Sequence, residues 1–175
     1  YVMGFVLIVA ASLWYKGFDS YRITPACDDL FSDKNDTGSF LVEKNGLVVD
    51  SRTGLTWYSC SAGQRFQDNE CLGDPMIFTW EQAQNFPQEF SASSSVEWRL
   101  PSEEELKSIR ESQCRNPSIN RIVFPGILVA NYWSSTPSRR GPGFGCAMYT
   151  YDGRVSCMMR KEQQYPILLI LDNKR

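Results

Sequence analysis

Residues 98–106 read WRLPSEEEL and set the local pattern from which the fold can be predicted. The apolar run Trp98–Leu100 ends at Pro101, and a residue that precedes proline is biased towards extended backbone. Ser102 and Glu105 have the spacing of a capping box, in which each side chain hydrogen-bonds the other residue's backbone N–H. The stretch therefore predicts a strand, a break and a helix start. Because Glu103, Glu104 and Glu105 lie at the positive end of that helix, we assign them to capping and to the helix dipole rather than to catalysis.

The flanking sequence indicates two short helices. Leu106 and Ile109, three residues apart, give the helix begun at Ser102 an inward face. A second capping box, Thr79 to Gln82, predicts another helix that stops near Pro87.

Strand signals occupy much of the remaining chain. Residues 40–44 and 47–50 flank Asn45-Gly46, a strong hairpin signal, and residues 55–58 form a third strand. Residues 131–136, 146–157 around an Asp-Gly turn, and 165–171 continue the pattern. Two short helices among many short strands predict an α+β domain with a mainly antiparallel sheet.

Composition narrows the classes of function. The chain has 175 residues and a net charge of −2, so it lacks the basic field that holds a nucleic-acid backbone. It contains no histidine, which removes Ser-His-Asp and Cys-His hydrolases and histidine-ligated zinc. We expect no cofactor and no metal.

Cysteine usage predicts disulfides in an oxidising compartment. Six cysteines are spread singly, without a C-x-x-C pair. We expect Cys60 and Cys71 to close the polar loop between them. Cys146 and Cys157 bracket a hairpin that places them nearly opposite each other, which favours a structural disulfide over a reactive thiol. The pairing of Cys27, Cys114, Cys146 and Cys157 stays open, because four cysteines allow three connectivities.

The first sixteen residues predict a single membrane-spanning helix. Residues 1–15 carry no charge, and Trp14, Tyr15 and Lys16 resemble an interfacial belt. A signal-peptide core and a buried core helix are the alternatives. We thus expect a membrane helix over residues 1–16, a tether over 17–38 and a domain over 39–175. The apolar residues assigned to the membrane are Phe5, Val6, Leu7, Ile8, Val9, Leu13 and Trp14.

Two further patterns have ordinary alternatives. Residues 33–43 resemble the opening of a calcium loop, but Thr37 and Lys44 occupy ligand positions, so a cluster of Asx turns is the preferred interpretation. The apolar run at Ile167, Leu169 and Leu171 is either core or, if it is exposed, a partner surface.

A set of motifs resembles one bacterial family. The motifs are VVDSRTGLTW (48–57), CSAGQ…C (60–71), FTWEQAQ (78–84), EWRLPSEEEL (97–106), NPSIN with FP (116–125) and YWSST (132–136). In order and spacing, over residues 40–171, they resemble the C-terminal domain of the Lcl collagen-like adhesin. The resemblance implies a C-type-lectin-like fold in which the first and last strands pair. Arg99-Leu100-Pro101 followed by acidic residues also resembles an element of the formylglycine-generating enzymes.

The composition, the motifs and the family resemblance are compatible with three functions. The first is a non-catalytic extracytoplasmic interaction module, anchored in the bacterial inner membrane with its domain in the periplasm, serving as an accessory subunit of an envelope assembly. The second is glycan binding, which the resemblance to an adhesin suggests. We expect Trp57, Trp80, Trp98 and Trp133 to pack in the core rather than to form a sugar platform. The third, a cysteine oxidase like the formylglycine generators, would depend on Cys146 and Cys157 and is disfavoured by their predicted disulfide.

Overall fold

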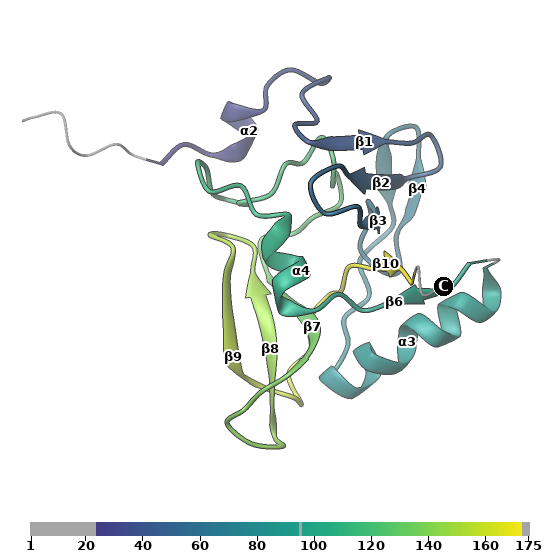
Figure 1. Ribbon diagram of the computed structural model, residues 1–175, viewed down its shortest axis with the longest axis vertical. Coiled ribbons are helices and arrows are strands. Elements are labelled where there is room, and N and C mark those ends of the chain that lie inside the picture. The colour runs from purple at the N-terminus through teal and green to yellow at the C-terminus, as the bar shows by residue number, and fades with distance from the viewer. Residues whose placement is uncertain (1–23, 95, 173–175) are drawn as a thin grey trace, which may run out of the picture.

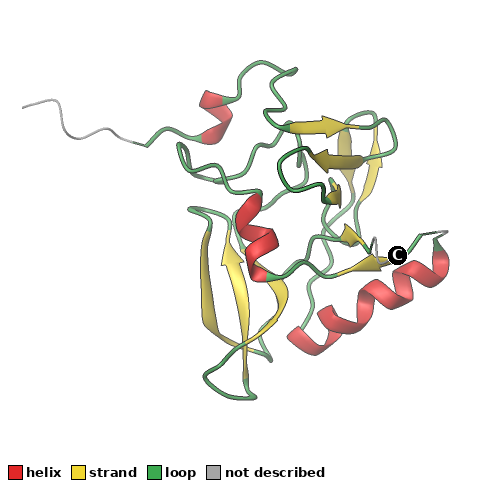
Figure 2. Cartoon of the chain, in the orientation of Figure 1, coloured by secondary structure: helices red, strands yellow, loops and turns green. Residues whose placement is uncertain are grey.

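The computed structural model describes residues 24–94 and 96–172, which form three antiparallel sheets and three helices (Figures 1 and 2). The longest helix lies along one side of the molecule, and the sheet formed by β7, β8 and β9 stands apart from the strands that precede it in the chain. The elements are α2 (Cys27–Leu30), β1 (Phe40–Val42), β2 (Leu47–Asp50), β3 (Thr56–Tyr58), β4 (Arg65–Gln67), β5 (Glu70–Leu72), α3 (Trp80–Ser93), β6 (Trp98–Arg99), α4 (Glu103–Ser108), β7 (Asn131–Pro137), β8 (Phe144–Tyr149), β9 (Arg154–Arg160) and β10 (Ile170–Leu171).

The main sheet has five strands in the order β1-β2-β3-β10-β6. The predicted hairpin is confirmed, since Phe40 pairs with Asp50 and Val42 with Val48 across a turn in which Gly46 has a φ of +80°. The last strand lies between β3 and β6 and does not pair with the first. The pairing of first and last strands implied by the family resemblance is therefore wrong for this chain.

Both predicted helix starts are confirmed as capping boxes. The hydroxyl of Thr79 accepts a hydrogen bond from the N–H of Gln82, and the Gln82 side chain accepts one from the N–H of Thr79. α3 does not stop near Pro87, as predicted, but continues to Ser93. The packing of Phe86 and Phe90, one helical turn apart, on other aromatic rings outweighs the backbone hydrogen bond that proline removes.

The arrangement of the core explains why apolar and polar residues do not alternate in residues 167–171. Leu168 and Ile170 belong to one buried cluster, with Trp57, whereas Ile167 and Leu169 belong to a second, with Trp133. A segment whose side chains alternate between two buried clusters reads as a continuous apolar run, and here it comprises β10 and the residues just before it. The structure thus places Ile167 and Leu169 in the core with no exposed surface, and only Leu171 is partly exposed. The exposure that the partner-surface alternative requires is therefore missing at Ile167 and Leu169.

The membrane-spanning helix that was part of the predicted fold class is not supported by the structure. The structure is mostly antiparallel sheet with few short helices, and within residues 24–94 and 96–172 no helix has both the length and the apolar character needed to cross a membrane. Residues 1–16, to which that helix was assigned, lie outside the described part of the chain.

Residues 24–38, predicted to be part of a tether, make several contacts with the domain. Ala26 forms a β-bridge with Arg115, and Asp28 pairs with Arg121 at 3.0 Å. Asn120 donates a side-chain hydrogen bond to the carbonyl of Asp36.

Candidate functional site

All six cysteines are paired in disulfides. Cys60–Cys71 is confirmed, and the other bridges are Cys146–Cys157 and Cys27–Cys114. Cys27–Cys114 fastens the 24–38 segment to the domain across 87 residues of chain, and Cys60–Cys71 closes the loop that holds β4 and β5. Three disulfides indicate that the domain folds in an oxidising, extracytoplasmic compartment.

Glu103 and the Cys146–Cys157 disulfide form the one group among the described residues with the composition of a metal site. A carboxylate oxygen of Glu103 lies 3.5 Å from the sulfur of Cys157. Metal binding by cysteine requires a thiolate, and both sulfurs are bonded to each other. The group therefore offers neither a metal ligand set nor a free thiol for cysteine chemistry.

The acidic stretch at residues 103–105 is part of an ion-paired helix start. Glu105 accepts hydrogen bonds from both terminal nitrogens of Arg99, at 2.8 and 2.6 Å, and from the N–H of Ser102 at 2.8 Å. The hydrogen bond from Arg99 lowers the pKa of Glu105 despite its partial burial. Glu103 and Glu104 both lie within 4 Å of the Lys107 ammonium. The capping role is confirmed for Ser102 and Glu105, and the Arg99 partnership is an addition that spacing alone did not predict.

The tryptophans are mostly core residues, as expected. Trp57 and Trp133 have no exposed surface and Trp98 is 9% exposed. Trp80 is only partly buried, and the ammonium of Lys161 lies 3.9 Å from the centre of its ring. None of these four residues lines the pocket beside the β4–β5 hairpin or the pocket beside α3.

The calcium-like segment forms Asx turns. The carboxylate of Asp33 accepts from the N–H of Asn35, and that of Asp36 accepts from the N–H of Gly38. These local hydrogen bonds fit the preferred interpretation of this segment. The seven residues assigned to the membrane, Phe5, Val6, Leu7, Ile8, Val9, Leu13 and Trp14, lie outside the described residues.

A pocket with both apolar and charged walls lies at the junction of the first hairpin, the Cys60–Cys71 loop, the 34–37 segment and the 121–125 segment. Its volume is ≈ 540 Å³, within the range of ligand sites. Its apolar surface comes from Val42, Phe66, Ile122 and Pro125, while Lys34, Arg121, Asp68 and Glu70 supply charge. We call this pocket the charged cleft.

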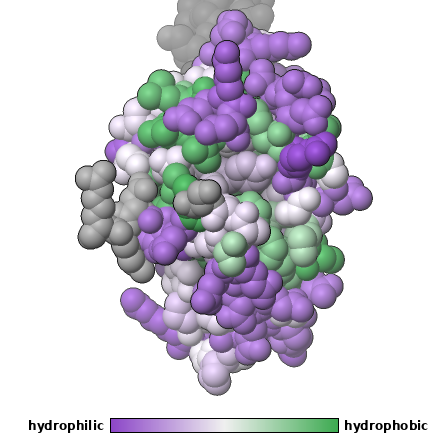
Figure 3. All heavy atoms as spheres, turned by 90° about the vertical axis from the view of Figure 1, so that its right-hand side faces the viewer, coloured by the Kyte–Doolittle hydropathy of each residue, from purple (hydrophilic) through white to green (hydrophobic). Residues whose placement is uncertain are grey.

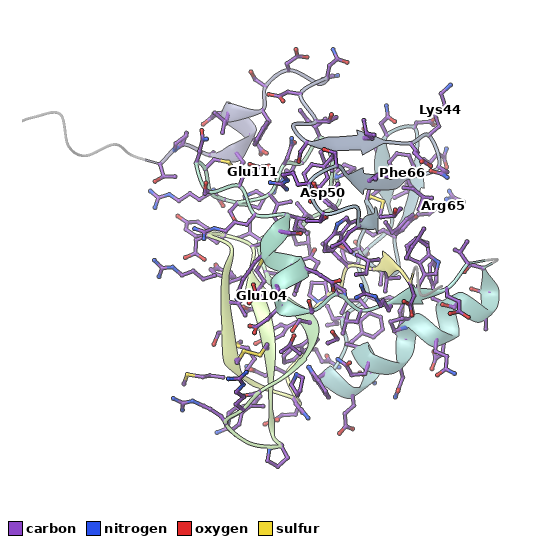
Figure 4. The ribbon with its side chains drawn as sticks, viewed as in Figure 1. Lys44, Asp50, Arg65, Phe66, Glu104 and Glu111 are labelled. Atoms are coloured by element: carbon purple, nitrogen blue, oxygen red, sulfur yellow. A yellow bond between two sulfur atoms is a disulfide. The ribbon has the colours of Figure 1, made fainter. Side chains whose placement is uncertain are left out.

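Glycines and disulfides fix the walls of the charged cleft. A Cβ atom on Gly46 would lie 2.6 Å from the Phe66 ring, so the glycine lets this ring pack directly on the first hairpin. Figure 4 shows Phe66 beside that hairpin, with Lys44 and Arg65 at the same edge of the molecule. A Cβ atom on Gly126 would lie 2.6 Å from Cβ of Cys71, so the 121–126 segment packs against the disulfide. Because both walls are tied in this way, the cleft is preformed.

The two positive charges of the cleft lie on one side, and the two negative charges lie on the other. Lys34 and Arg121 belong to the segments fastened by Cys27–Cys114 and by the Asp28–Arg121 ion pair. Asp68 and Glu70 belong to the β4–β5 hairpin, whose turn holds Asp68 and Asn69 in the left-handed conformation, at φ of 52° and 63°. Within the described residues, no ion pair joins the two walls. Among the described residues, Lys34, Asp68 and Glu70 form no ion pair and are available to a ligand, whereas Arg121 already pairs with Asp28.

A second acidic group lies near the end of α4. Burial raises the pKa of Glu111, with Asp36 and Asp50 adding to the rise and Arg52 opposing it. Asp50 has no exposed surface, and hydrogen bonds from Arg52 and Thr53 lower its pKa even though burial acts to raise it. Figure 4 shows Asp50 and Glu111 in the same region of the molecule. Asp50 serves the structure of the 50–54 turn.

These features define a mostly β domain with three disulfides, a cleft between fixed walls and no free thiol. The model of the Lcl C-terminal domain family matches residues 46–170. The chain therefore belongs to the Lcl C-terminal domain family, in agreement with the resemblance found in its motifs. This membership and the disulfides support an extracellular, adhesin-like interaction module in general terms. A comparison with curated proteins found no match.

Proposed function

We propose that this domain is a non-catalytic, extracytoplasmic interaction module of the cell envelope whose charged cleft binds a segment of a protein partner. The observation that carries the proposal is the arrangement of the cleft. Apolar side chains line the cleft together with Lys34 and Arg121 from one pair of segments and Asp68 and Glu70 from the β4–β5 hairpin. A polypeptide can present an apolar side chain together with charges of both signs, so it complements all three surfaces.

A glycan complements this cleft less completely. A sulfated glycan carries only negative charge and is repelled by Asp68 and Glu70. A neutral glycan could stack on Phe66 and donate hydroxyl hydrogen bonds to Asp68 and Glu70, but it gives Lys34 and Arg121 no charged partner. Neutral glycan binding is therefore the second candidate function.

The absence of catalysis is part of the proposal. The sequence has no histidine, and all six cysteines are committed to disulfides. The acid with a clearly raised pKa, Glu111, is half-buried near the end of α4 and does not line the charged cleft. The carboxylates in the cleft, Asp68 and Glu70, are accompanied by neither a histidine nor a free cysteine, so the proposal assigns them to charge complementarity rather than to catalysis.

Site-specific photo-crosslinking tests the proposal in the producing cell. A photoreactive amino acid replaces Glu70 of the full-length protein, and a matched variant carries it at Arg154, an exposed position on β9. We expect one discrete protein adduct from position 70 that is absent from position 154. Equal adducts from both positions, or none from either, would overturn the assignment of the cleft.

Charge reversal then separates protein binding from glycan binding. With the crosslinked partner purified, Glu70→Lys should weaken binding roughly tenfold or more, the loss of about 1.4 kcal/mol expected for one interfacial charge pair. A glycan array provides the second arm. If the wild type retains a neutral glycan and Phe66→Ala does not, the cleft binds a sugar and the proposal of a protein partner is wrong.

A further inference from the structure

A second pocket, separate from the charged cleft, lies between the 74–78 segment and α3. Its volume is ≈ 350 Å³, and Met76, Ile77, Phe78 and Phe86 supply its apolar surface, with Asn85 and Glu89 on the α3 side. We call it the α3 groove. In Figure 1, α3 lies below β4, beside which the charged cleft opens, so the two sites occupy different parts of the molecule.

The groove exposes large apolar side chains on a fixed backbone. Met76 is 47% exposed and Ile77 is 54% exposed. The N–H of Met76 donates to the carbonyl of Ala62 at 2.8 Å, and Phe78 exchanges backbone hydrogen bonds with Tyr165. Gly63, at a φ of +92°, lets the Met76 backbone approach closely. Because the backbone that carries these two residues is fixed, binding here costs little backbone conformational entropy.

Aromatic packing makes the floor of the groove rigid. The Phe78 and Phe86 rings lie 4.8 Å apart, and Phe90 stacks on Phe86 at 5.9 Å. Phe90 in turn contacts Trp98 of the core. Figure 3, which views the molecule from the side where α3 and β4 lie in Figure 1, shows hydrophobic residues exposed among hydrophilic ones.

The one charged side chain among the residues that line the groove, Glu89, is acidic. Residues 66–98 contain no lysine or arginine and six acidic residues, Asp68, Glu70, Asp74, Glu81, Glu89 and Glu97, whereas the whole chain has a net charge of only −2. α3 itself carries Glu81 and Glu89 and no cation. Among the described residues, the cation in contact with α3 is Lys161. Its ammonium lies over the ring of Trp80, in the first turn of the helix. No ion pair involves Glu81 or Glu89 within the described residues.

We propose that the α3 groove is an interaction site for a basic amphipathic segment of a protein partner. One or two apolar side chains of this segment fill the space between Ile77 and Phe86, and flanking lysines or arginines face Glu89 and Glu81. The acidic rim repels nucleic acids, sulfated glycans and anionic membrane surfaces, which leaves a cationic polypeptide as the complementary class. The site is independent of the charged cleft, so the domain has two places at which to hold partners.

Synthetic peptides measure this directly on the purified full-length protein. The probe is a short peptide that alternates leucine with lysine, and the comparison probes are an all-lysine peptide of equal charge and a peptide that alternates leucine with glutamate. We expect the leucine–lysine peptide alone to bind with saturation, and its affinity to fall as salt is raised. Ile77→Asp should weaken it roughly tenfold or more, because an apolar contact worth at least about 1.4 kcal/mol is replaced by a desolvated charge.

Matched variants distinguish the groove from general charge attraction. Leu128→Asp introduces the same negative charge at a position that is 44% exposed and outside both pockets, and it should leave binding unchanged. Glu81→Lys combined with Glu89→Lys should transfer preference to the leucine–glutamate peptide. Unfolding curves confirm that each variant is folded. Equal binding of the all-lysine peptide, equal losses in Ile77→Asp and Leu128→Asp, or no binding by the wild type would overturn the proposal.

Discussion

The Arg99–Glu105 pair should be a principal stabilising contact between the main sheet and α4. Both side chains are only partly exposed, at 33% for Arg99 and 20% for Glu105. Glu105→Ala removes two charge-assisted hydrogen bonds from Arg99 and the cap bond from the N–H of Ser102. In this variant Arg99 still pairs with Asp172, at 3.7 Å, and remains partly exposed to water, so its charge is not left buried without a partner.

The magnitude follows from these contacts. A hydrogen bond to a charged group contributes roughly 1.5–3 kcal/mol, and a helix cap about 1 kcal/mol. Because Arg99 retains a second partner, we expect Glu105→Ala to lower the free energy of unfolding by about 2–3 kcal/mol. Glu105→Gln keeps an acceptor for Ser102 and should cost about half as much.

Urea denaturation followed by tryptophan fluorescence measures these values, and pH supplies an independent check. The folded-state pKa of Glu105 is lowered, so its contribution is present above the ordinary glutamate pKa and is lost as pH falls through the lowered value. The deficit of Glu105→Gln should therefore shrink as the solution is acidified. A double-mutant cycle between Arg99→Ala and Glu105→Ala should give a coupling energy of roughly 1–2 kcal/mol. Coupling near zero, or a deficit that does not depend on pH, would refute the reasoning.

Four further substitutions test other parts of the structure. Ser102→Ala should lower the free energy of unfolding by about 1 kcal/mol and leave partner binding unchanged; weaker binding at equal stability would contradict this. Burial raises the pKa of Glu111, so Glu111→Gln should increase stability at neutral pH, and in urea denaturation the gain should disappear below the ordinary glutamate pKa. Replacing both Cys27 and Cys114 by serine should lower the free energy of unfolding by roughly 2 kcal/mol more than replacing both Cys60 and Cys71, because the first disulfide closes a loop of 87 residues and the second a loop of 11. Equal thermal midpoints for the two double variants would contradict this. Gly126→Ala should destabilise by about 1–3 kcal/mol through overpacking against Cys71, as read from thermal unfolding.

Local signals in the sequence predicted the parts of the fold that depend on neighbouring residues. The hairpin at Asn45-Gly46 and the two capping boxes each involve residues close in the chain, and all three are present. The Cys60–Cys71 bridge is of the same kind, since its loop is short. The family resemblance was also confirmed, because it depends on the order of motifs.

Features that depend on distant packing were not predicted. The extent of α3 beyond Pro87 is decided by Phe78 and Trp98, which lie outside the helix. The position of β10 between β3 and β6 has no local signature. Neither pocket was predicted. The charged cleft is assembled from segments far apart in the sequence, whereas the α3 groove lies within residues 76–89 and depends on the continuation of α3 past Pro87. The absence of lysine and arginine between Arg65 and Arg99 is the one signal of the α3 groove that could have been read beforehand.

The central position of β10 has a consequence for how the domain matures. A chain exported from its N-terminus can form the β1–β2–β3 meander and the Cys60–Cys71 bridge early, but β6 has no partner in the main sheet until residues 170–171 arrive. Both core clusters also wait for residues 167–170. Until then, the unfinished domain exposes apolar surface and unpaired strand edges, which are features that chaperones and proteases recognise. Quality control can therefore distinguish complete from truncated copies by whether this one strand is inserted.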